Sequence, residues 1–73
     1  MDNKPLIEMN YEELFAYLSS GVQYKNAEKV YSEVNASDVN LFNRFSLRQE
    51  AELSMVWGGV IKAALAVSAL RQT

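Results

Sequence analysis

Residues 53–70 read LSMVWGGVIKAALAVSAL, a run of eighteen residues in which Lys62 is the only charged side chain. At about 100° per residue, the large apolar side chains of this run spread over most of a helical circumference. A helix that is apolar all round must be buried on several sides. The run therefore predicts a long helix that needs more cover than one short chain provides, so that other copies of the chain, a partner or lipid must supply the rest.

The composition limits the classes of function. The chain has 73 residues, a net charge of −2, and neither Cys nor His. We expect one small domain, residues 1–73, whose core gives marginal stability unless association reinforces it. Disulfides are excluded, and the lack of Cys and His argues against metal, haem and iron–sulfur sites. We predict no enzyme, no catalytic residues and no cofactor. Because Lys and Arg form no cluster, no nucleic-acid partner is expected.

The first half of the chain predicts a helical arm with a break in it. Residues 1–9 contain the single Pro and are expected to form an irregular lead-in. Asn10 is a suitable N-cap, with Glu12 and Glu13 in the first turn, where acidic side chains favour the helix dipole. The apolar spacing is helical over residues 10–34, but the apolar face shifts midway. Because Gly costs a helix about 1 kcal/mol relative to Ala, we place the break at Gly21.

Residues 35–38 form a turn-rich cluster, and Ser37 or Asp38 is expected to cap the helix that follows. No Pro interrupts residues 39–72, so one long helix is predicted there. No stretch shows convincing strand-like alternation. The predicted fold class is therefore all-α: a helical hairpin with a broken first arm and a long apolar C-terminal helix.

The C-terminal helix is also the candidate interface. Gly58 and Gly59 are interpreted as a place where a neighbouring helix comes close, as small residues allow in tightly packed helices. Lys62 must either reach solvent with its ammonium group, pair across a subunit boundary, or point into a lumen formed by several copies. The predicted interface residues are Leu53, Val56, Trp57, Gly58, Gly59, Val60, Ile61, Lys62, Leu65, Val67 and Leu70.

Three sets of short motifs follow one another along the chain: Ser20-Gly21-Val22, Ser37-Asp38 followed by Leu41-Phe42 and Phe45, and Val60-Ile61-Lys62 followed by Ala66 and Val67. Together these motifs resemble the needle and inner-rod subunits of type III secretion systems. The chain departs from that pattern in having Val39 at the usual turn Pro and no Asp after Lys62. The resemblance implies a subunit of a hollow helical filament or rod, a homo-oligomer that contacts a secretion apparatus or chaperone. It also implies export to the cell surface or beyond without a cleaved signal peptide.

Two other classes stay open. The segments Ala27-Glu28-Lys29-Val30, Ser37-Asp38 and 51–55 (AELSM) resemble the small Hha-type nucleoid modulators, which implies a cytoplasmic regulatory or chaperone-like binding module. The chain lacks the Asp-His-Arg and the basic character of that family. The third class is a membrane-inserted small protein, because residues 53–70 are just long enough to span a bilayer. Lys62 near the centre of the span would cost about 2.5–3.5 kcal/mol on insertion scales.

Overall fold

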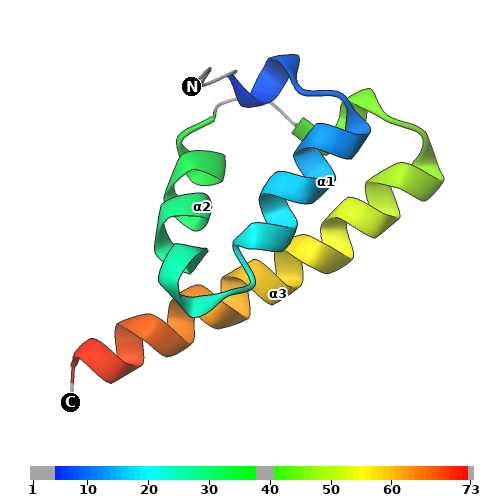
Figure 1. Cartoon of the computed structure of the whole chain (residues 1–73). Helices are drawn as coiled ribbons and strands as arrows, with labels where there is room; N and C mark the ends of the chain where they lie inside the picture. The colour runs from blue at the N-terminus through cyan, green and yellow to red at the C-terminus, as the bar shows by residue number, and fades with distance from the viewer. Residues whose placement is uncertain (1–4, 38–40, 73) are drawn as a thin grey trace.

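The computed structural model describes residues 5–37 and 41–72, and every regular element in these ranges is helical. Two short 3₁₀ helices, η1 (Leu6–Glu8) and η2 (Leu41–Arg44), accompany three α-helices: α1 (Tyr11–Ser20), α2 (Tyr24–Ala36) and α3 (Leu47–Arg71). Helices α1 and α2 lie on one side of α3, which extends beneath both of them (Figure 1). The predicted fold class, all-α with a broken first arm and a long apolar C-terminal helix, is confirmed.

The start of α1 follows from the residues that precede and open it. The Asn10 side chain accepts a hydrogen bond from the backbone N–H of Glu13 at 2.8 Å, and the Glu13 carboxylate accepts one from the Asn10 N–H at 3.1 Å. This reciprocal pair satisfies two backbone donors that a helix start otherwise leaves without a partner. The predicted N-cap at Asn10 is confirmed. The predicted irregular lead-in contains one regular turn, η1.

The long helix begins later than the sequence pattern predicted. We expected it from residue 39 after a turn over residues 35–38, but α2 continues to Ala36 and α3 starts at Leu47. Residues 38–40 lie outside the described part of the chain. Ser46 caps α3, because its hydroxyl accepts from the Gln49 N–H at 3.2 Å and the Gln49 side chain accepts from the Ser46 N–H at 3.4 Å. Ser37, one of the two expected caps, instead terminates α2.

Helix η2 separates α2 from α3 because its side chains have partners elsewhere. Leu41 is buried in the core. The Arg44 guanidinium donates to the carbonyl oxygens of Leu6 at 3.1 Å and Met9 at 3.0 Å, so it ties η2 to the chain that enters α1. A continuous helix from residue 39 would give up these contacts. Helices η1 and η2, which are far apart in the sequence, therefore lie close together at the top of Figure 1.

Gly21 lies where the first arm breaks, as predicted, and its lack of a side chain leaves room for Val30 of α2. Its backbone is in the ordinary right-handed helical region, with φ −77° and ψ −9°, so no special conformation requires glycine. A Cβ atom built on Gly21 would lie 2.7 Å from Val30 Cβ and 2.8 Å from Val30 Cγ1. These distances are well inside van der Waals contact, so the missing side chain lets α2 pack closely against the end of α1.

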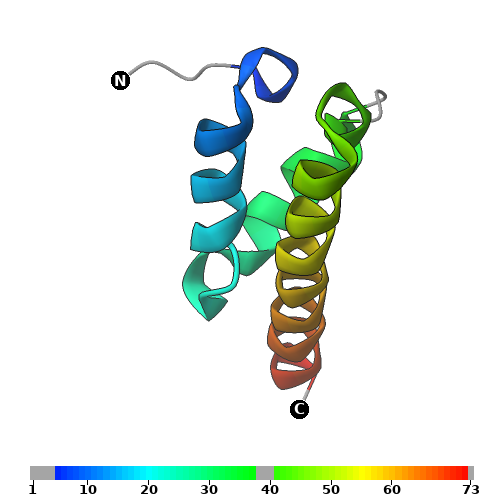
Figure 2. The same ribbon diagram turned by 90° about the vertical axis from the view of Figure 1, so that its right-hand side faces the viewer.

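The core fills the space between the broken arm and α3. Its buried members come from all three helices and η2: Leu14, Leu18, Val30, Leu41, Leu53 and Val60. A second buried group, Ala27 with Ala63 and Ala64, brings α2 close to the C-terminal half of α3. Figure 2 shows α1 and α3 as two separate columns, with α2 passing behind the space between them. Each part of the broken arm therefore covers a different portion of the same face of α3.

Polar contacts at the edges hold this arrangement. The Tyr17 hydroxyl of α1 donates to the Glu33 carboxylate of α2. Burial raises the pKa of Tyr17, and the hydrogen bond to Glu33 and the charge of Glu33 raise it further, so the phenol stays protonated at physiological pH. At the other end, the Arg71 guanidinium donates to the Glu28 carboxylate at 3.1 Å and links the last turn of α3 to α2.

We predict that Gly21→Ala destabilises the fold. The added methyl group has to displace Val30 from a filled core, and overpacking of this kind costs about 1–3 kcal/mol. Urea unfolding followed by circular dichroism measures the loss. The matched control is Gly58→Ala, since a Cβ at Gly58 meets no atom within 4 Å. That change lies inside α3 and should raise the free energy of unfolding by about 0.5–1 kcal/mol. A Gly21→Ala variant as stable as the parent would contradict the close packing.

Candidate association surface

Helix α3 has two apolar faces, and only one of them packs on the rest of the chain. Leu53, Val60, Ala63 and Ala64 are its buried residues, and all lie toward α1 and α2. At about 100° per residue, the opposite side of the helix is occupied by residues that recur every three or four positions. They are Leu47, Ala51, Ser54, Met55, Gly58, Lys62, Leu65 and Ala69, all exposed, and we call them the outer face of α3.

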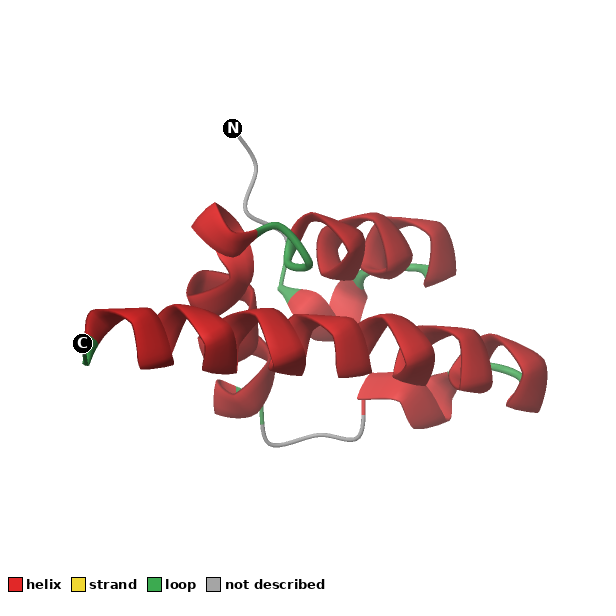
Figure 3. Cartoon of the chain, turned by 90° about the horizontal axis from the view of Figure 1, so that it is seen from below, coloured by secondary structure: helices red, strands yellow, loops and turns green. Residues whose placement is uncertain are grey.

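The outer face carries large apolar side chains that the fold leaves in solvent. Leu47 is 85% exposed, Met55 79% and Leu65 62%. Seen from below, α3 lies in front of the other elements over its whole length, and no described segment crosses it (Figure 3). An exposed helix face in a small soluble domain is normally polar. Lys62 is the only charged member of this face, which therefore differs from an ordinary solvated surface.

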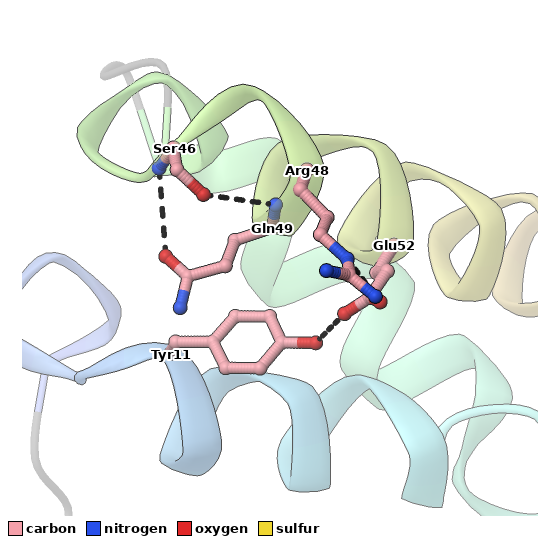
Figure 4. Close-up of polar contacts among 5 residues, drawn as sticks. All are labelled: Tyr11, Ser46, Arg48, Gln49 and Glu52. Atoms are coloured by element: carbon pink, nitrogen blue, oxygen red, sulfur yellow. Dashed lines mark hydrogen bonds and ion pairs between the residues drawn. The ribbon is translucent and has the colours of Figure 1, made fainter.

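Charged residues border the outer face near its N-terminal end. Arg48 and Glu52 lie four residues apart on α3, with Nε and Oε2 4.0 Å from each other. The Tyr11 hydroxyl donates to Glu52 from α1, so the carboxylate is held at the edge of the outer face (Figure 4). That hydrogen bond raises the pKa of Tyr11, because loss of its proton would place a phenolate against the carboxylate.

The structure divides the predicted interface residues into three groups. Leu53 and Val60 are fully buried in the core of their own chain and have no surface left for a second chain. Val56 and Trp57 are half-buried against that core, and the Trp57 ring stacks on Tyr31 with 5.6 Å between centroids. The other half-buried members are Gly59, Ile61 and Val67, and the exposed members are Gly58, Lys62, Leu65 and Leu70.

The two glycines have different surroundings. A Cβ on Gly59 would lie 3.1 Å from Val22 Cγ1, so this glycine admits the turn between α1 and α2 of its own chain. The close approach of another subunit at Gly59 stays a prediction. Gly58 has open space above it and remains available to an approaching helix.

Lys62 is exposed at the middle of the outer face. It makes no ion pair with any residue of the ranges 5–37 and 41–72. The predicted snorkelling, in which the ammonium group reaches water, fits the position of Lys62 in the single chain. Pairing across a subunit boundary stays a prediction.

Sequence reasoning missed part of the outer face. Leu47 and Ala51 lie before the uncharged run that begins at Leu53, and Met55 and Ala69 lie within it but were not selected. A signal was present in the sequence, because residues 47, 51, 58, 65 and 69 follow the spacing of one helical face. Nothing in that spacing says which face of an all-round apolar helix the rest of the chain covers.

Neither a metal site nor a membrane span follows from these residues alone. In the described part of the chain, no group of His, Cys, Asp and Glu side chains is arranged to hold a metal ion. Helix α3 is long and apolar enough to cross a bilayer by length and composition, a criterion that core helices of soluble proteins also meet.

Comparison with protein-family models, with curated proteins and with solved structures finds no match.

We predict that truncating Leu53 lowers the free energy of unfolding far more than truncating Leu65. Leu53→Ala removes a fully buried side chain and should lower the free energy of unfolding by about 2–5 kcal/mol. Leu65→Ala removes a side chain that is 62% exposed. It should change the free energy of unfolding by less than about 0.5 kcal/mol. Both values are measured by urea unfolding at low micromolar protein, where association contributes least. Equal losses at the two positions would contradict the division of α3 into an inner and an outer face.

Proposed function

We propose that the chain is a non-enzymatic structural subunit that self-associates through the outer face of α3. The observation that carries the proposal is the exposure of Leu47, Met55 and Leu65 along one side of a helix whose other side is already packed. Large apolar side chains aligned along one exposed helix face of a small domain support an interaction site there. Burying it on another chain would remove the exposed apolar area from water, which is the main driving force for protein association.

Helices α1 and α2 pack against the inner side of α3 and leave its outer face exposed, which supports this proposal. The buried side chains of the broken arm, Leu14, Leu18 and Val30, pack into the core on the inner side of α3. The outer face runs from Leu47 to Ala69, about 33 Å at 1.5 Å per residue. No described element remains to cover a surface of that length. A cover for this face has to come from outside the described residues.

The finer form of the proposal is a filament or rod subunit, as the resemblance to needle and inner-rod proteins implies. A head-to-tail polymer needs two different surfaces that fit each other, whereas a closed dimer needs only one surface that fits itself. The outer face is one such surface. Ile7, Val22 and Tyr24 are exposed apolar side chains outside α3 and are candidates for the second. Particle size separates the two forms, because a polymer grows with concentration and a dimer stops.

Membrane insertion is the competing occupant of the outer face, since α3 meets the length and composition criterion for a span. Insertion would strip Leu53 and Val60 of their contacts with α1 and α2. It would also place the Lys62 ammonium group in hydrocarbon, which is costly without a partner. We therefore favour protein as the cover of this face.

We predict that the chain associates in buffer free of detergent and that a polar outer face abolishes the association. Sedimentation velocity over about 5 to 500 µM should show the parent chain moving from monomer to larger species as mass action requires. The double variant Met55→Gln with Leu65→Gln should stay monomeric over the same range. A second variant, Ile7→Gln with Tyr24→Gln, removes exposed apolar groups outside α3. It should leave a closed dimer intact, because that dimer uses the outer face alone, and it should abolish a head-to-tail polymer, which needs the second surface as well. A parent chain that stays monomeric throughout would refute the proposed function.

A further inference from the structure

The two leucines and two alanines of the outer face are placed so that they are complementary to the same face reversed. Leu47 lies at one end and Leu65 toward the other, with Ala51, Gly58 and Ala69 placed among them. Gly58 lies at the midpoint between Leu47 and Ala69, and also at the midpoint between Ala51 and Leu65. The pattern is therefore symmetric in position about Gly58 but opposite in size: each leucine on one side matches an alanine on the other.

We infer that the occupant of the outer face is a second copy of this chain, with its α3 antiparallel to the first and crossing it at Gly58. The inference rests on the proposed function and adds the partner and its geometry. In a two-fold symmetric pair the same patch is used on both subunits. Leu47 of one copy then lies at the level of Ala69 of the other, and Leu65 at the level of Ala51. Large side chains meet small ones twice, and the two backbones approach most closely at the glycines.

Gly58 suits the crossing point because nothing in its own chain occupies the space above it. A residue without a side chain at the centre of a helix pair lets the axes come close, as small residues do in other tightly packed helices. Close approach brings Leu47 and Leu65 into contact with the partner backbone as well as with its alanines. The helix weakening that Gly58 causes is thereby offset by packing in the pair.

The charges of the face favour the antiparallel arrangement. On the helical wheel, Lys62 and Glu52 lie about 40° and 120° to the same side of Gly58. In an antiparallel pair whose two-fold axis is perpendicular to the helices, the same flank of each helix lies on the same side of the interface. Measured along the helix axis, Lys62 of one copy then lies within about 3 Å of Glu52 of the other. The Glu52 carboxylate accepts a hydrogen bond from Tyr11 and lies 4.0 Å from the Arg48 Nε, but its side chain is 47% exposed and each oxygen can accept a further donor, so it can also accept Lys62.

A parallel pair places the same residues less favourably. Each Lys62 would then lie beside the Lys62 of the other copy, and like charges at one level repel. Leu65 would meet Leu65 while Gly58 and Ala51 faced their equivalents across a gap, so large and small residues would not interdigitate. The antiparallel pair instead satisfies Lys62 twice and fills the space beside each alanine.

The expected dimer is weak. The outer face is about 33 Å long and a helix is about 10 Å across, so its footprint is roughly 330 Å². A standard stable interface hides about 800 Å² of accessible surface per partner. One helix pair falls below that scale, so the dimer should dissociate in the micromolar range or above.

Charge exchange tests the Lys62–Glu52 pair. Lys62→Glu alone and Glu52→Lys alone each place like charges opposite one another, and each should raise the dimer dissociation constant about tenfold, given that about 1.4 kcal/mol corresponds to a factor of ten. Mixing the two variants restores opposite charges at both contacts of a mixed dimer, so the mixture should regain the parent affinity. Circular dichroism of each variant checks that its helices are intact. A mixture no tighter than either variant alone would overturn the pairing.

Cysteine cross-linking tests the geometry, and the chain has no native Cys to interfere. Ala51→Cys mixed with Leu65→Cys should form a disulfide-linked dimer under mild oxidation, because the two positions lie at one level of the antiparallel pair and Gly58 is kept. Leu47→Cys should not link to itself, because its two copies lie about 33 Å apart in an antiparallel pair. Leu47→Cys mixed with Ala69→Cys should link to each other.

The parent chain is measured in parallel by sedimentation and by flotation with phosphatidylcholine vesicles. These two measurements show whether the chain associates with itself or with lipid.

The outcomes separate the inference from the proposed function. Linkage in both mixed pairs, without self-linkage of Leu47→Cys, supports the antiparallel dimer. Self-linkage of Leu47→Cys shows a parallel pair, and overturns the inference while leaving self-association standing. A parent chain that associates without linkage in either mixed pair also overturns only the geometry. A parent chain that stays monomeric in buffer, whether or not it floats with vesicles, overturns both.

Discussion

From Leu53 onward helix α3 is apolar on all sides, and the other described elements cover only one of them. Every other feature of the fold relates to this constraint. Leu53 and Val60 anchor the covered side, and the leucines of α1 and Val30 of α2 pack against them. On the uncovered side, Leu47, Met55 and Leu65 remain in solvent. Because the core covers only one side of α3, apolar surface stays in solvent, and association with another molecule would bury it.

The broken first arm is what lets a short chain cover α3 as far as it does. A straight arm would contact one line along α3, whereas the break at Gly21 directs α1 and α2 over different stretches of it (Figure 1). Val30 occupies the space that a Gly21 side chain would take. Tyr17 and Arg71 add hydrogen bonds to Glu33 and Glu28 at the edges of the arm. Because these contacts are few and mostly exposed, the apolar packing on α3 provides most of the cohesion.

Local signals in the sequence predicted some parts of this structure well. Asn10 followed by Glu13 is a capping pair, and Gly21 marks the break, since both features act through neighbouring residues. The start of α3 was misjudged because the apolar spacing of Leu41, Phe42 and Phe45 resembles a helix. The capping pair Ser46 and Gln49 was also present and decided the outcome. The inner and outer faces of α3 were not distinguishable beforehand, because a helix that is apolar all round has no polar side to show its orientation.

The central claim is that one side of α3 belongs to the core and the other to a second molecule. The most direct test follows backbone amide signals of the isotope-labelled parent chain by nuclear magnetic resonance during dilution from about 500 to 5 µM, a range in which a weak dimer dissociates. The account predicts concentration-dependent shifts at Ala51, Gly58 and Leu65, with constant signals at Leu14 and Leu18 in α1. Signals that stay constant everywhere, or that shift equally in α1 and on the outer face of α3, would contradict it.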